Sequence, residues 1–76
     1  MDGGVLVAVR QPLGVFLADL RRYRPGHLGW DADVAELRLT GTFPIADTDQ
    51  ILAALQDTLP VRVHARTRYW VSVRAA

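Results

Sequence analysis

The strongest constraint on the fold of this 76-residue chain is a pattern of apolar residues that occurs twice. Each copy has the i, i+3, i+4 spacing of one face of an α-helix, and each ends at a proline, Pro25 or Pro60, so the copies are offset by 35 residues. With this offset Phe16–Ala18 falls on Ile51–Ala53, and a short β-type run precedes and follows each helix. Two copies are too few for a solenoid. The sequence therefore predicts one compact, internally duplicated domain of two β-α-β units.

Turn and cap residues set the boundaries of the expected elements. Pro12 suits the first turn of a helix that continues to about Arg24. Asp47, with Gln50 three residues later, has the pattern of a capping box for the second helix, which Pro60 ends. Strands are expected at 5–9, 28–30, 37–43, 61–66 and 70–74, with a polar turn at 31–36, which gives an α/β (α+β) domain with the order β-α-β, β-α-β, β.

Seven apolar side chains occupy the inward positions of these elements and are expected to be substantially buried. Half of the chain is apolar and 22% is charged, a composition ordinary for a globular domain that has such a core. The expected core residues are Leu13, Leu17, Leu20, Leu28, Phe43, Leu52 and Leu55.

The last two strands are expected to form an antiparallel hairpin with one apolar face. Directly opposite residues of such a pair point to the same face, and a two-residue loop at the tip would mix apolar with polar residues. A three-residue loop at Thr67–Tyr69, or an equivalent bulge, pairs Ala65 with Val71 and Arg66 with Trp70. The tip also lacks the Asn-Gly or Gly that two-residue turns favour.

This pairing leaves a polar outer face on the hairpin, where Arg66 is expected to stack on Trp70. A tryptophan flanked by arginines is typical of binding hot spots, so an exposed Trp70 would make this face a partner-binding surface. The alternative is that the domain's own chain covers Trp70. The candidate partner-binding residues are Arg62, His64, Arg66, Trp70, Ser72 and Arg74.

The composition argues against metal sites and against strong nonspecific binding of polyanions. A net charge of +1 is too small for such binding to nucleic acid or anionic lipid, and a chain without cysteine has no disulfide and no thiolate ligand. His27 and His64 lie in different halves, with no third ligand at a recognisable spacing. Asp31, Asp33 and Glu36 have the acid density of a calcium loop. The segment lacks the central glycine of an EF-hand loop and the third acid at the spacing that such a loop requires. No metal and no cofactor are expected.

Catalytic and nucleic-acid-binding motifs are also weak. The single serine, Ser72, lies inside a strand without a Gly-x-Ser-x-Gly elbow, so the chain is expected not to be an enzyme. Gly26 and Gly29 match the G-x-x-G of KH domains, but this segment leads into an acidic stretch rather than a second helix. A helix-stop glycine and a close-packed strand glycine are the favoured interpretation. The cluster Arg21, Arg22 and Arg24 is expected to complement the dipole at the helix end.

Several segments along the whole chain resemble the C-terminal periplasmic domain of FecR-type anti-sigma regulators. Two of them are the more specific: the Arg-Tyr-Arg-x-Gly stretch within Leu20–Gly26, and the Leu-Pro-Val-Arg-Val stretch at 59–63. The other matching segments are Asp2-Gly3, Gln11-Pro12-Leu13, Leu37–Phe43, Leu55–Leu59 and Tyr69-Trp70-Val71. Within the family, the regulator of ferric citrate uptake is the member that the chain looks most like.

The resemblance implies an STN-like fold, in which the two helices of two β-α-β units lie between two small sheets. It implies that residues 1–76 are a single periplasmic domain of a longer inner-membrane protein, with one transmembrane helix and a cytoplasmic sigma-factor partner outside this chain. The partner of the domain itself would be the N-terminal signalling domain of a TonB-dependent outer-membrane receptor, whose iron-chelate occupancy, ferric citrate for example, is relayed to transcription. The alternatives are the signalling domain of a receptor or secretin, and a small KH-like nucleic-acid-binding domain.

Overall fold

A computed structural model describes residues 4–76, so Asp2 and Gly3 of the resemblance lie outside the described residues. The chain forms a small α+β domain, and among residues 4–76 no helix is long and apolar enough to cross a membrane. The elements are β1 (Val5–Pro12), α1 (Leu13–Leu20), the 3-10 turn η1 (Arg21–Tyr23), β2 (His27–Trp30), α2 (Ala32–Ala35), β3 (Arg38–Pro44), α3 (Thr48–Thr58), β4 (Val61–Thr67) and β5 (Trp70–Ala75).

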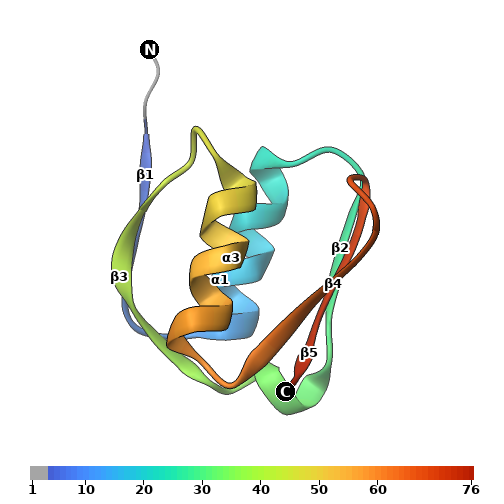
Figure 1. Cartoon of the computed structure of the whole chain (residues 1–76). Coiled ribbons are helices and arrows are strands. Elements are labelled where there is room, and N and C mark those ends of the chain that lie inside the picture. The colour runs from blue at the N-terminus through green and yellow to red at the C-terminus, as the bar shows by residue number, and fades with distance from the viewer. Residues whose placement is uncertain (1–3) are drawn as a thin grey trace.

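The helices α1 and α3 lie side by side between two sheets (Figure 1). One sheet is the antiparallel pair β1-β3, and the other has the order β2-β5-β4, with β5 parallel to β2 and antiparallel to β4. The units β1-α1-β2 and β3-α3-β4 each contribute one strand to each sheet. The expected fold class, two helices between two small sheets, is therefore confirmed, and β5 is the strand without a counterpart in the repeat.

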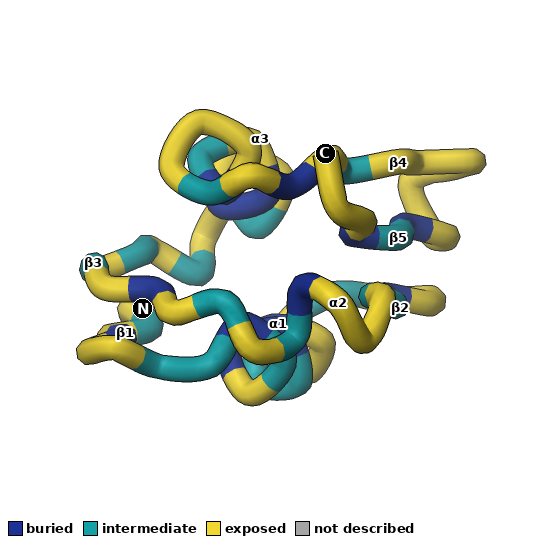
Figure 2. The backbone as a smooth tube through the Cα atoms, turned by 90° about the horizontal axis from the view of Figure 1, so that it is seen from below, coloured by how far each residue is buried: buried dark blue, intermediate teal, exposed yellow. Residues whose placement is uncertain are grey.

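The core lies where the two units face each other, with buried residues on the inner sides of α1 and α3 (Figure 2). Phe43, by contrast with the other expected core residues, is only half-buried, since it lies at the rim between β3 and α3 and packs edge-on against Phe16, ring centroids 5.2 Å apart. The six expected core residues that are buried are Leu13, Leu17, Leu20, Leu28, Leu52 and Leu55.

Two local predictions were wrong: the polar turn at 31–36 and the end of the first strand. The acidic segment Asp31–Glu36 contains the short helix α2, because Val34 turns into the core and is 1% exposed. The first strand runs to Pro12 rather than ending at residue 9, because a bulge between Ala8 and Gln11 lets it continue past a shift in register. The Asp47 cap is as expected, with its Oδ1 accepting a hydrogen bond from the Gln50 N–H at 3.2 Å.

The hairpin of β4 and β5 contains the bulge that the sequence offered as the alternative to a three-residue loop. Ala65 lies opposite Val71, as predicted, but the register then shifts, so Trp70 pairs with Thr67 and not with Arg66. The bulge takes up Arg66, which leaves a tight turn whose Tyr69 N–H donates to the Thr67 Oγ1 at 3.1 Å.

Candidate partner-binding face

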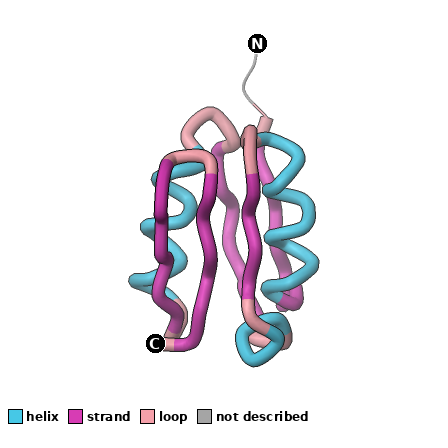
Figure 3. The backbone as a smooth tube through the Cα atoms, turned by 90° about the vertical axis from the view of Figure 1, so that its right-hand side faces the viewer, coloured by secondary structure: helices cyan, strands magenta, loops and turns pink. Residues whose placement is uncertain are grey.

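The outer surface of the β2-β5-β4 sheet brings together the polar residues of three strands. Figure 3 looks onto this sheet from outside, with the two strands of the hairpin beside β2. On β5 the buried side chains Val71 and Val73 alternate with Trp70, Ser72 and Arg74, which face outward. We call this surface the basic-aromatic face; its residues are His27, Arg62, His64, Arg66, Trp70, Ser72 and Arg74, all exposed except the half-buried Ser72.

Trp70 is the largest side chain of the basic-aromatic face and is 48% exposed. Its ring stacks on that of His27, with centroids 4.4 Å apart and an interplanar angle of 26°, so the predicted stacking on Arg66 was wrong. His27 and Trp70 are register partners in the parallel pair β2-β5, and this pairing holds the two rings together. Arg66 and Thr67 instead line a shallow hollow beside Trp70.

The two glycines of the G-x-x-G segment each have a structural role here. Gly26 has a φ of +85°, and a Cβ at this position would overlap the carbonyl oxygen of Tyr69. Gly29 lies under the imidazole of His27, whose Nε2 would be 2.7 Å from a Cβ at that position. Because the segment leads into β2 and its second glycine is inside that strand, it does not join two helices as a phosphate-clamping loop does.

Arg24 is a buried clamp rather than part of a solvated cluster at the helix end. Only 6% of its side chain is exposed, and it forms an ion pair with the Asp49 Oδ1 at 2.7 Å. Its guanidinium also donates to the Thr48 Oγ1 at 2.9 Å and to the Arg68 carbonyl oxygen at 3.1 Å. Arg24 therefore ties the connection between η1 and β2 to the start of α3 and to the turn between β4 and β5.

The same turn is held by the backbone next to Arg24. The His27 N–H donates to the Tyr69 carbonyl oxygen at 2.7 Å, so consecutive carbonyls of the turn, at residues 68 and 69, are both bound from the segment 24–27. These bonds fix the position at which β5 begins. The orientation of Trp70 thus depends on residues more than 40 positions earlier in the chain.

The charged side chains in the last part of the sequence are all positive. The sequence after Asp57 contains four arginines and no acidic residue, although the whole chain has a net charge of only +1. Three of these arginines, Arg62, Arg66 and Arg74, belong to the basic-aromatic face. A one-signed patch of this kind steers and orients an oppositely charged protein surface.

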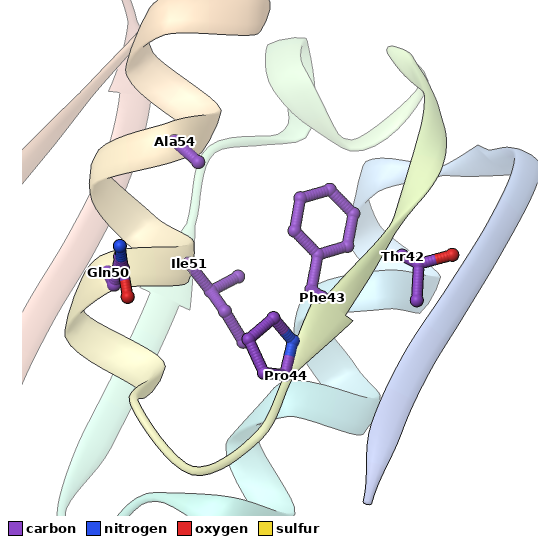
Figure 4. Close-up of a pocket in the computed structure, with 6 residues that line it drawn as sticks. All are labelled: Thr42, Phe43, Pro44, Gln50, Ile51 and Ala54. Atoms are coloured by element: carbon purple, nitrogen blue, oxygen red, sulfur yellow. The ribbon is translucent and has the colours of Figure 1, made fainter.

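One hollow outside the basic-aromatic face has no charged side chain in its lining. A pocket of about 280 Å³ between β3 and α3 is lined by neutral side chains, among them Phe43, Ile51 and Ala54 (Figure 4). Within residues 4–76, no three histidine or acidic side chains lie close enough to hold a metal ion. The acidic residues Asp31, Asp33 and Glu36 flank or belong to the single turn of α2.

No protein-family model matches the sequence, and no curated protein matches it. The fold, however, is present in two crystal structures of a candidate anti-sigma factor from Parabacteroides distasonis. Each superposes with a TM-score of 0.79 over 96% of this chain, at 19% and 20% sequence identity. This chain spans 34% of the length of those chains, about one third. At this level of identity the similarity shows a shared fold.

Proposed function

We propose that this chain is the periplasmic signalling domain of a FecR-type anti-sigma regulator, and that it binds the N-terminal signalling domain of a TonB-dependent receptor. The shared fold with a candidate anti-sigma factor supports the regulatory class. The resembling segments also have structural roles in this chain. Arg24 and Gly26 of the Arg-Tyr-Arg-x-Gly stretch position the turn that precedes Trp70.

The observation that carries the proposal is the half-exposed Trp70 stacked on His27 among exposed basic side chains of the same sheet. Rigid aromatic groups surrounded by arginine dominate the binding energy of many interfaces. The stacking orders the indole before any partner arrives, which reduces the entropy lost on binding. We therefore assign the basic-aromatic face as the receptor-binding surface, with an acidic surface as its complement.

Calorimetry against a panel of receptor signalling domains from the same organism tests the proposal. Trp70→Ala should weaken binding of the cognate domain at least fivefold, about 1 kcal/mol, while the variant stays folded. Tyr23→Ala is the matched control, because Tyr23 is an equally exposed aromatic residue, 49%, outside the face, and should leave affinity unchanged.

The same calorimetry, repeated with a regulator's periplasmic domain and with RNA at several salt concentrations, separates the alternatives. A chain that bound a regulator's periplasmic domain instead would be the signalling domain of a receptor or secretin. A chain that bound RNA with steep salt dependence and no receptor domain would be a nucleic-acid-binding module. Unchanged receptor affinity in a folded Trp70→Ala variant would remove the basic-aromatic face from the interface.

A further inference from the structure

The strand β1 lies on the side of the molecule opposite the β2-β5-β4 sheet (Figure 1), and it exposes a row of valines. Val5, Val7 and Val9 are 53%, 63% and 74% exposed, and they alternate with Leu6 and Ala8, which face the core. No charged residue interrupts β1 before Arg10. A strand with this pattern normally has its outer face or its edge covered by another strand or helix.

The alternation of hydrogen bonds between β1 and β3 shows which backbone groups of β1 point away from β3, toward the free edge. The Gly4 carbonyl oxygen accepts from the Ile45 N–H at 3.1 Å, and the same register continues through Leu6 opposite Phe43. Because bonded and non-bonded pairs alternate in an antiparallel ladder, the N–H and C=O groups of residues 5 and 7 point away from β3. Pro44, which has no N–H to donate, lies opposite Val5 in agreement with this phase.

This edge of β1 is open. The sheet consists of β1 and β3, and within residues 4–76 no strand pairs with the other side of β1. The edge strand β4, by contrast, is closed by its own domain. There the Val63 N–H donates to the Gln56 Oε1 at 3.0 Å, and the Val61 N–H donates to the Leu59 carbonyl oxygen at 2.7 Å.

We propose that β1 pairs antiparallel with β1 of a second copy of this chain, about a two-fold axis at Val7. The segment Val-Leu-Val-Ala-Val is symmetric in its pattern of valines, so Val7 meets Val7 of the second copy and Val5 meets Val9. The outward N–H and C=O groups of the two Val7 residues then bond to each other, and all the valines lie on one face of a sheet with the order β3-β1-β1-β3. Such a contact is isologous and closes as a dimer.

A second copy fits this edge because the contact brings no like charges together: Arg10 falls opposite Gly4 of the second copy. One short strand pair buries well under the roughly 1,000 Å² of a stable interface, so we expect the dimer to be weak and concentration-dependent. This inference does not depend on the proposed function.

Disulfide trapping tests the register, because the natural chain has no cysteine. Directly opposite residues in a bonded antiparallel pair have Cα atoms about 5.5 Å apart, within the range that a disulfide spans. Val7→Cys should therefore form a cross-linked dimer at least tenfold faster than Val15→Cys. Val15 is the matched control, a 50% exposed valine on α1 rather than on the open edge.

Two further samples define the direction of the strands. Val5→Cys alone should cross-link slowly, because antiparallel pairing at Val7 separates the two residues 5 by four positions, about 13 Å. A mixture of Val5→Cys and Val9→Cys should form the mixed dimer rapidly. Cross-linking of Val7→Cys at the rate of Val15→Cys would overturn the self-pairing, and rapid cross-linking of Val5→Cys alone would overturn the antiparallel register.

Sedimentation of the unmodified chain provides the test without a covalent trap. Its mean mass should rise with concentration, whereas Val7→Lys should stay monomeric with an unchanged circular dichroism spectrum, because the side chain points to solvent. Val15→Lys should associate like the unmodified chain. The proposal is contradicted if the unmodified chain stays monomeric at millimolar concentration, or if a folded Val7→Lys variant still dimerises.

Discussion

The two sheets of this domain cover the same pair of helices, yet they present opposite surfaces to solvent. The β1-β3 sheet exposes neutral valines and an open backbone edge, whereas the β2-β5-β4 sheet exposes Trp70 amid basic side chains and has its β4 edge closed by Gln56. Each unit supplies one strand to each sheet, so the difference lies in the side chains of these strands and in the additional strand β5. The strand β5 enters only one of the sheets and carries Trp70 and Arg74 there, beside His27 of β2 and the basic side chains of β4. One domain can thus hold two contact surfaces of different chemistry.

The largest expected effect comes from the core that the two sheets share. Leu20 and Leu55 occupy equivalent positions of the two units, and both are 0% exposed. Truncating either residue to alanine should lower the free energy of unfolding by about 2–5 kcal/mol, because it leaves a cavity between the layers. Chemical denaturation followed by fluorescence and by circular dichroism should show one transition in each variant. If either sheet survived the unfolding of the other, the two surfaces would belong to separate cooperative units.

The next largest effect is the loss of stability expected when Arg24, which supports the three-stranded sheet, is replaced. Arg24→Ala should cost about 1–3 kcal/mol of stability, since it removes several charge-assisted hydrogen bonds to the turn and to α3. Arg22→Ala is the matched control, because Arg22 is exposed and should change stability by no more than about 0.5 kcal/mol. Asp49→Asn should cost less than Arg24→Ala, because the Asp49 side chain is 80% exposed. Equal losses for Asp49→Asn and Arg24→Ala would mean that the ion pair, rather than the fork of bonds to the turn, holds the sheet.

A smaller effect is expected at the edge of β4, which should become more like the edge of β1 in its hydrogen exchange when Gln56 is replaced. Gln56→Ala removes the acceptor of the Val63 N–H, at a cost of about 0.5–1.5 kcal/mol. Hydrogen exchange of the Val63 amide should accelerate about fivefold, toward the rate of the Val7 amide in dilute, monomeric protein. Asp57→Asn, on the same exposed turn of α3, is the control and should leave Val63 protected. Unchanged Val63 exchange in Gln56→Ala would show that the amide group of Gln56 does not close the edge.

The smallest expected effect is zero. Millimolar calcium should not shift the melting temperature, since within residues 4–76 no three acidic or histidine side chains converge. Magnesium at the same concentration controls for ionic strength. A rise of several degrees with calcium alone would reveal a site around Asp31, Asp33 and Glu36.

Local patterns predicted much of this structure. The apolar stripe that contains Leu20 and the one that contains Leu55 predicted both helices, their common phase and the duplication. The inward face of a short helix can be read from a single stretch of sequence. The valines of the last hairpin predicted the pairing of Ala65 with Val71 for the same reason. The short helix α2 was not predicted because Val34 is its only buried residue, and one buried position does not show a helical periodicity.

The features missed at the candidate site all depend on long-range pairing. His27 was not predicted on the basic-aromatic face, because nothing local indicates that β2 lies beside β5. The clamp at Arg24 was missed likewise, since its partners Thr48, Asp49 and Arg68 are 24 to 44 positions away. An arginine at a helix end looks the same in sequence whether it points to solvent or into a turn from the other unit.

The place of β5 has a consequence for how the chain is made. It follows the other four strands of residues 4–76 in the sequence, and it is the middle strand of its sheet, so β2 and β4 have no partner there until residues 70–75 are available. Such non-local pairing delays completion of this domain until residues 70–75 have emerged from the ribosome. Trp70 and His27 come together only when β5 pairs with β2. Their stacked rings therefore form only in the completed sheet, and a chain cut before residue 70 lacks both the indole and the middle strand.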